Sequence, residues 1–180
     1  LIDSRLEGVK VLDPAVGSAA FPVEMMQVLV KIRKKLNVTV GKNINEVSLK
    51  KQFIKNNLYG VDIMNEAVEI AKLRLFLKLV ATVEVDYRKP NLGLEPLPDI
   101  DFNIRAGNTL IGFATETELD KAFVGKIDFD NNKNKIKEKC DLVARTFQRY
   151  KEIQLSQGDD YKDFKQAKDE LNNRLKNLNE

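Results

Sequence analysis

The chain has 180 residues, of which 43% are hydrophobic and 32% are charged, so it can bury one sizeable core and is not a disordered polymer. Its 30 lysine and arginine residues against 27 acidic residues give a net charge of +3, which permits a nucleic-acid partner without arguing for one. A single cysteine and the absence of histidine exclude an internal disulfide, a Cys/His zinc site, and catalysis by Ser-His-Asp or Cys-His groups.

The sequence carries no signal for a membrane or for secretion. No apolar run approaches the roughly 20 residues that cross a bilayer, so we expect no membrane partner. The first residues, Leu1 to Arg5, form neither a signal peptide nor a start with an initiator methionine. We therefore expect a cytoplasmic protein and a sequence that is a fragment of a longer parent chain.

The first predicted strand covers residues 9–12, a short β-branched apolar run that ends before a proline. A loop of small residues follows, and apolar residues then recur at helical spacing from Phe21 to the basic stretch 31–35. A second helix is predicted over residues 46–56. The apolar run 58–63 after it predicts the second buried strand.

We expect Asn65 to cap a third helix that continues to residue 80 and has little polar face. Three prolines fall within residues 89–98, which predicts a loop before a third strand over residues 102–106. The order strand, helix, strand, helix, strand is typical of a parallel sheet with right-handed crossovers. The fold class is therefore predicted to be α/β.

The composition changes from about residue 125 onward, where long polar stretches carry spaced apolar residues that Gly158 interrupts. This pattern predicts two helices in an antiparallel hairpin, with Tyr150, Tyr161 and Phe164 in its core and Cys140 as a packing residue. We divide the chain into residues 1–124, which carry the sheet, and residues 125–180, the appended hairpin.

The loop after the first strand is the first candidate site, because its side chains are small. Small residues let a backbone approach a ligand closely, and the amides that open the next helix favour a polar or anionic group such as an amino-acid carboxylate. Ligands of α/β sheets bind at this carboxyl edge of the strands. A tight turn that only joins strand to helix is the alternative. The candidate residues are Asp13, Pro14, Ala15, Val16, Gly17, Ser18, Ala20 and Phe21.

The ends of the second and third strands each carry one polar candidate. Asp62 lies at the tip of the second strand, where a carboxylate can accept hydrogen bonds from two ribose hydroxyls; a cap on the next helix is the alternative role. Asn108 follows the third strand and offers both a donor and an acceptor, which suits the edge of an adenine base. The pair Gly107 and Asn108 is also a common turn signal.

Three segments together resemble the motifs of the amino-methylating DNA methyltransferases. Residues 13–21, DPAVGSAAF, resemble motif I, a loop that wraps the methionine part of S-adenosylmethionine. YGVDI at residues 59–63, with AVEIAKLRL after it, resembles motif II, and IRAGNTLI at residues 104–111 resembles motif III. The chain departs from motif I at Ala19, where glycine is usual. A methyl group there would crowd the cofactor or resist a positive φ angle.

The resemblance is to the N6-adenine-specific DNA methyltransferases of the Eco57I-like, type IIG restriction-modification family, and it covers residues 9–113. It implies a Rossmann-like, S-adenosylmethionine-dependent methyltransferase sheet, present in part, with the hairpin as an insertion. It also implies DNA as the partner and the amino group of adenine as the methyl acceptor, in a restriction-modification or phage-defence system.

The resemblance also assigns roles to the candidate residues. The loop of motif I holds the methionine end of the cofactor, and Asp62 binds its ribose. Ile63 flanks the cofactor's adenine, which the third segment contacts through Asn108, Thr109 and Leu110. No metal is implied.

Members of this family transfer the methyl group with Asn-Pro-Pro-Tyr or a similar motif after a fourth strand, where it holds a flipped-out adenine. No Asn-Pro-Pro occurs in this sequence. We therefore expect no catalytic residue and no activity in this fragment alone, and we assign that motif and the target-recognition domain to the remainder of the parent chain. Two alternatives stay open: a methyltransferase of the same fold acting on RNA or protein, and a non-catalytic interaction module with a degenerate cofactor pocket.

Overall fold

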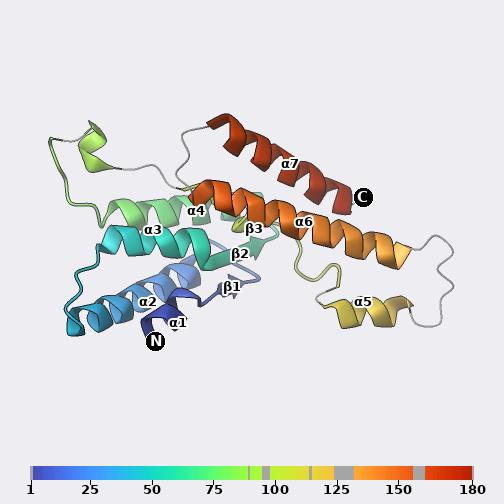
Figure 1. Cartoon of the computed structure of the whole chain (residues 1–180), viewed down its shortest axis with the longest axis horizontal. Helices are drawn as coiled ribbons and strands as arrows, with labels where there is room; N and C mark the ends of the chain where they lie inside the picture. Colours follow the sequence, from blue (N-terminus) through green and yellow to red (C-terminus); the bar gives the residue numbers. More distant parts are fainter. Residues whose placement is uncertain are drawn as a thin grey trace. The chain divides into compact units, whose positions relative to one another are not determined.

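The computed structural model describes residues 2–88, 90–94, 98–113, 115–123, 132–155 and 161–179. The chain forms two compact units, Leu1–Gly112 and Phe113–Glu180. The first unit carries the sheet with its helices, and the second consists of helices in the part that is described (Figure 1).

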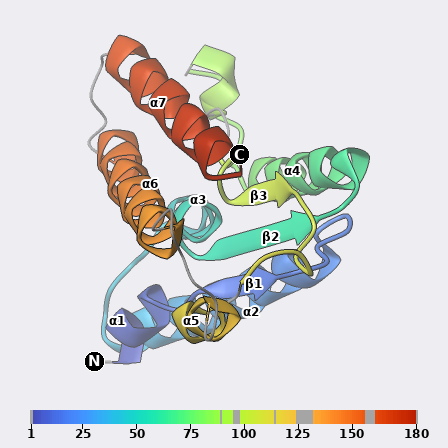
Figure 2. The same ribbon diagram turned by 90° about the vertical axis from the view of Figure 1, so that its right-hand side faces the viewer.

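Three parallel strands form the sheet of the first unit, in the order β1-β2-β3 (Figure 2). Its elements in chain order are α1 (Ile2–Glu7), β1 (Val11–Asp13), α2 (Ala20–Thr39), α3 (Glu46–Asn56), β2 (Leu58–Asp62), α4 (Asn65–Val80), the short 3₁₀ turn η1 (Pro90–Gly93) and β3 (Ile104–Ala106). In the pairing register, Asp13 lies opposite Gly60, and Asp62 lies opposite Ala106. The predicted α/β fold with a parallel sheet is confirmed.

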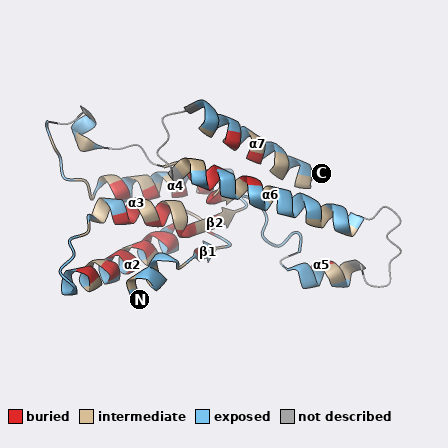
Figure 3. Cartoon of the chain, in the orientation of Figure 1, coloured by how far each residue is buried: buried red, intermediate tan, exposed pale blue. Residues whose placement is uncertain are grey.

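The core of this unit lies where the strands meet α2, α3 and α4 (Figure 3). Burial alternates along β2: Leu58 and Gly60 are buried, whereas Tyr59 and Val61 are partly exposed. Since successive side chains of a strand point to opposite faces, one face of the sheet carries the core. The helices contribute fully buried apolar side chains to it, among them Met26, Phe53, Ile54, Ala71 and Leu75.

Two buried asparagines fix the starts of the strands. Asn57 donates through Nδ2 to the carbonyl oxygens of Glu7 and Val9, at 2.7 and 2.6 Å. Asn103 donates through Nδ2 to the carbonyl oxygen of Leu58, at 2.9 Å. A buried carbonyl oxygen without a donor is costly. These two side-chain amides therefore hold β1 and β2 in register at positions to which the backbone hydrogen bonds between the strands do not extend.

The first two helices differ from the sequence-based expectation. Helix α1 was not predicted from the sequence; an ion pair of 2.7 Å between Arg33 Nε and Asp3 Oδ1 connects it to α2. The helix α2 continues to Thr39, four residues past the basic stretch. It ends where Gly41 takes a φ of 73°, a left-handed conformation that commonly follows a helix C-terminus.

The expectation that Asn65 caps α4 is wrong. The cap position is Met64, and Asn65 is the first residue of the helix. The carboxylate of Asp62 already accepts the Met64 N–H at 3.0 Å, so the start of the helix is satisfied from the strand before it.

The second unit contains α5 (Glu116–Phe123), α6 (Asn132–Leu155) and α7 (Tyr161–Asn179). The rings of Tyr150 and Phe164 lie 5.5 Å apart, and Lys139 reaches the carbonyl oxygen of Asn177, so α6 and α7 run antiparallel as predicted. Cys140 is exposed, so the expectation that it packs in the hairpin is wrong. The turn at Gly158, the side chain of Tyr161 and the boundary between residues 124 and 125 fall outside the described residues, and that boundary stays a prediction.

Candidate functional site

The carboxyl ends of the three strands bring the predicted site residues to one edge of the sheet. The loop 14–19 follows β1, Ile63 and Met64 follow β2, and residues 107–111 follow β3. Because the strands are parallel and adjacent, segments that are up to 95 residues apart in the sequence are within hydrogen-bond reach.

The loop after β1 is fastened to β2 by backbone groups. The Val16 N–H donates to the carbonyl oxygen of Val61 at 2.9 Å, and the Gly17 N–H donates to Asp62 Oδ2 at 2.8 Å. Gly17 has a φ of 48°, and a methyl group at this position would meet nothing within 4 Å. The backbone of Gly17 therefore borders open space and needs the conformational freedom of glycine.

Ala19 takes the positive φ angle that the sequence analysis expected an alanine to resist. Its φ and ψ are 60° and 32°, and its methyl group is fully buried in the core. The residue stands at the N-cap of α2, where its N–H donates to the Val16 carbonyl oxygen at 2.8 Å. The methyl group thus faces the protein interior and does not fill the open space at the loop. An alanine at this position instead destabilises the fold through backbone strain.

Asp62 accepts two backbone hydrogen bonds, one from Met64 at the start of α4 and one from Gly17. These donors, Met64 first and Gly17 second, lower the pKa of the Asp62 carboxyl below its ordinary value. The side chain is partly exposed, so it is a carboxylate at neutral pH that solvent can reach. This position is compatible with both roles considered from the sequence. One is a cap on the next helix, and the other is an acceptor of hydrogen bonds from ribose hydroxyls.

The segment after β3 is tied to the other two segments. Thr109 donates through Oγ1 to the carbonyl oxygen of Pro14 at 3.1 Å, and the Gly107 N–H donates to the backbone carbonyl oxygen of Asp62 at 2.8 Å. Asn108 accepts the Leu110 N–H through Oδ1 at 2.9 Å, which is the turn geometry considered as its alternative role. Asn108 is exposed, and among the described residues its side-chain NH₂ group has no hydrogen-bond partner.

Large apolar side chains are exposed along this edge. The exposed fractions are 54% for Phe21, 73% for Ile63 and 91% for Leu110. Val16 differs from the other candidate residues, because its side chain is 4% exposed and packs into the core. Gly60, which the sequence analysis did not single out, lies beneath Val16; a glycine inside an apolar strand was the available signal.

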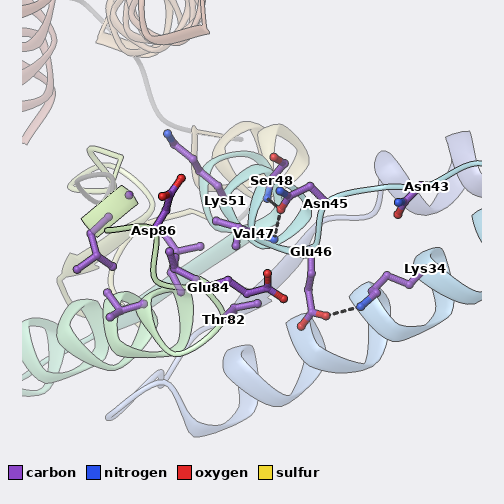
Figure 4. Close-up of a pocket in the computed structure, with 15 residues that line it drawn as sticks. Lys34, Asn43, Asn45, Glu46, Val47, Ser48, Lys51, Thr82, Glu84 and Asp86 are labelled. Carbon is purple, nitrogen blue, oxygen red and sulfur yellow. Dashed lines mark hydrogen bonds and ion pairs between the residues drawn. The ribbon is translucent and has the colours of Figure 1, made fainter. Parts of the chain in front are cut away.

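A separate cleft of about 640 Å³ lies elsewhere in the first unit (Figure 4). Its lining includes Lys34, Glu46, Lys51 and Glu84, and no residue of the three strand-end segments. The last turn of α4 contributes to it, roughly 20 Å along the helix from the end of β2. An ion pair of 2.5 Å between Lys34 and Glu46 already neutralises part of its charge.

The described ranges contain neither a candidate metal site nor a candidate membrane span. No group of three or more histidine, cysteine, aspartate or glutamate residues is placed to hold a metal ion in those ranges. None of the helices within them is long and apolar enough to cross a membrane.

The parallel order β1-β2-β3, with small, acidic and amide-bearing segments at successive strand ends, defines part of a Rossmann-like methyltransferase sheet. Residues 56–178 match the model of the Eco57I restriction-modification methylase family, and the chain belongs to this family, as predicted. The matched range covers α6 and all of α7 except its last residue, so the family model extends over the helical hairpin.

The chain is also similar to a putative type II restriction enzyme and methyltransferase of Methanocaldococcus jannaschii. The two are 41% identical over 112 residues, which are 62% of this chain and 9% of that protein. The chain therefore spans less than a tenth of the length of this relative. A comparison with solved structures found no match.

Proposed function

We propose that this chain is the S-adenosylmethionine-binding part of a DNA methyltransferase that modifies the amino group of adenine in a restriction-modification or phage-defence system. The observation that carries the proposal is the edge itself, where hydrogen bonds join a glycine-containing loop, the carboxyl end of β2 with Asp62, and the segment that carries Asn108. Membership of a restriction-modification methylase family supports a reaction on DNA.

The groups at this edge fit the three parts of S-adenosylmethionine. Open space beside the backbone of Gly17 suits the amino-acid end, and the ionised Asp62 suits two ribose hydroxyls. The exposed side chains of Ile63 and Leu110 offer apolar surface for the faces of an adenine ring. The free NH₂ group of Asn108 suits a ring nitrogen of that base.

Bound S-adenosylmethionine supplies an electrophilic methyl group. The residues of this chain bind and orient the molecule, so their contribution to catalysis is positioning. We assign the group that holds the target base to another part of the protein, since this sequence contains no Asn-Pro-Pro. By itself the chain is therefore expected to bind the cofactor without transferring its methyl group.

Isothermal titration of the chain with S-adenosylmethionine, S-adenosylhomocysteine and NAD⁺ tests the proposal. We expect saturable binding of one equivalent of the first two ligands and much weaker binding of NAD⁺. The variant Asp62→Asn should bind at least about tenfold more weakly, because it loses the charge that strengthens the ribose contacts. Glu84→Gln, an exposed carboxylate in the separate cleft, is the matched control and should bind as the unchanged chain does.

Absence of saturable heat with both sulfur-containing ligands would refute the proposal and favour a non-catalytic module. The substrate is tested on the longer protein, by mass spectrometry of nucleosides after incubation with DNA or RNA. N6-methyladenine in DNA is the expected product. A methylated ribonucleoside would assign the chain to another methyltransferase class.

A further inference from the structure

We infer that Val16 and Gly60 are a pair of positioning residues that set the height of the loop 14–19 above the sheet and thereby the affinity for the cofactor. The affinity part of this inference rests on the proposed function. The contact between the two residues stands on the structure alone, and it can be tested without any ligand.

Gly60 leaves room that the side chain of Val16 fills. A methyl group at position 60 would lie 2.7 Å from Val16 Cγ2 and 2.8 Å from Val16 Cβ. It would also lie 3.2 Å from Cδ1 of Ile104 on the neighbouring strand. Ordinary carbon contacts are about 3.5–4.0 Å, so no side chain fits at position 60 while Val16 keeps its place.

Gly17 and Gly60 are therefore needed for different reasons. Gly17 has a positive φ angle and open space around it, whereas Gly60 has no positive φ angle and lacks space. The requirement at position 60 is close packing between the strand and the loop above it.

The position of Val16 determines where the neighbouring backbone groups of the loop lie. Its side chain is 4% exposed, and its N–H is bonded to Val61, the residue after Gly60. The next residue, Gly17, carries the N–H that meets Asp62, and the Val16 carbonyl oxygen accepts the N–H of Ala19. A shift of Val16 therefore moves the backbone of Gly17, which borders the open space, together with its bond to Asp62 and the start of α2.

The variant Gly60→Ala tests this arrangement directly. The loop must rise by about 1 Å to restore ordinary contact distances, and displacements of this size disrupt a binding geometry that tolerates only about 0.5 Å. We expect the dissociation constant for S-adenosylhomocysteine to rise about tenfold or more in the folded variant. Gly8→Ala is the matched control, because its added methyl group would meet its nearest atom, the Arg5 carbonyl oxygen, at an ordinary 3.6 Å.

A second control separates positioning from general loss of stability. Leu79→Ala removes a buried side chain at the far end of α4 and lowers stability without touching the loop. At a temperature where all variants are folded, Leu79→Ala should keep the original dissociation constant and Gly60→Ala should not. Equal loss of affinity in both variants would overturn the inference.

Double substitution provides the pairwise measurement. Val16→Gly removes both Cγ2 and Cβ, the two closest neighbours of the new methyl group, so Gly60→Ala should cost less affinity in that background than in the original chain. Strictly additive effects would show that the two positions do not act together, and would contradict the inference.

Amide hydrogen exchange followed by NMR tests the contact independently of any cofactor. In Gly60→Ala the N–H groups of Val16 and Gly17 should lose protection, while the N–H groups of α4 keep theirs. If these two amides keep their protection, the inference fails. If they lose protection but the unchanged chain binds neither sulfur-containing ligand, the contact stands, while the proposed function and the affinity part of the inference are refuted.

Discussion

Replacement of Ala19 by glycine isolates the cost of a methyl group at the start of α2. Ala19 has a φ of 60° and no exposed surface. The left-handed conformation costs an alanine about 1–2 kcal/mol, which glycine would recover. Two effects of Ala19→Gly lower stability. The loss of a buried methyl group costs about 0.8 kcal/mol, and the higher conformational entropy of the unfolded chain costs about 0.4–1 kcal/mol. The free energy of unfolding should therefore change by less than about 1 kcal/mol in either direction.

The same variant decides whether the methyl group limits cofactor binding. Since the methyl group points into the core, its removal should change the affinity for S-adenosylmethionine less than about threefold, which is below 1 kcal/mol. Urea denaturation followed by circular dichroism and calorimetric titration measure the two quantities. Ala19→Val is the contrasting variant, and it should lose about 1–3 kcal/mol of stability because a β-branched side chain is forced into a closed space. A tenfold gain in affinity for Ala19→Gly would refute the assignment of the methyl group to the core.

Three further predictions concern the contacts around the site and at α1. Thr109→Val removes the hydrogen bond to the Pro14 carbonyl oxygen, and it should weaken cofactor binding about two- to tenfold in a titration while the melting temperature hardly changes. Arg33→Met breaks the ion pair with Asp3 and should lower the free energy of unfolding by about 1–3 kcal/mol in urea; a change below about 0.5 kcal/mol would contradict this. The pKa of Asp3 is lowered by the hydrogen bond from Arg33, and the pKa of Glu46 by those from its two lysine partners. The two ionised carboxylates therefore contribute to the stability of the fold. This contribution is complete above a pH of about 5, and it is lost as the pH falls through the ordinary carboxyl range toward the pKa values of the folded state. Thermal melts should show stability declining from about pH 5 downward. In Asp3→Asn that decline should be shallower.

Part of this fold follows from local sequence patterns. The apolar runs before Asp13 and Asp62 are short, β-branched and bounded by turn residues, so their strands could be placed within two residues. The third strand was expected from residue 102 and begins at Ile104, because Asn103 is bonded through its side chain to the start of β2. Helix α1 gave no pattern of its own, since its short length leaves its stability to the contact with Arg33.

The site residues could likewise be placed from the sequence only where local patterns determine their positions. The sequence could place Gly17, Asp62 and Asn108 at or just after the ends of successive strands, and parallel topology then brings them to one edge. It could not show that Val16 packs into the core or that Gly60 makes room for it, because both facts depend on the distance between β2 and the loop. The conformation of Ala19 was equally out of reach, since its positive φ angle is imposed by the surrounding packing against its intrinsic preference.

The hydrogen bonds that join the three loops have an entropic consequence. Gly17 is held by Asp62, Thr109 by Pro14 and Gly107 by the end of β2 within the chain itself. A ligand that arrives at a ready-made surface does not have to order it, and ordering each mobile side chain would cost about 0.5–1.5 kcal/mol of binding free energy. We therefore expect most of the affinity of a ligand at this edge to come from complementarity that exists before the ligand binds.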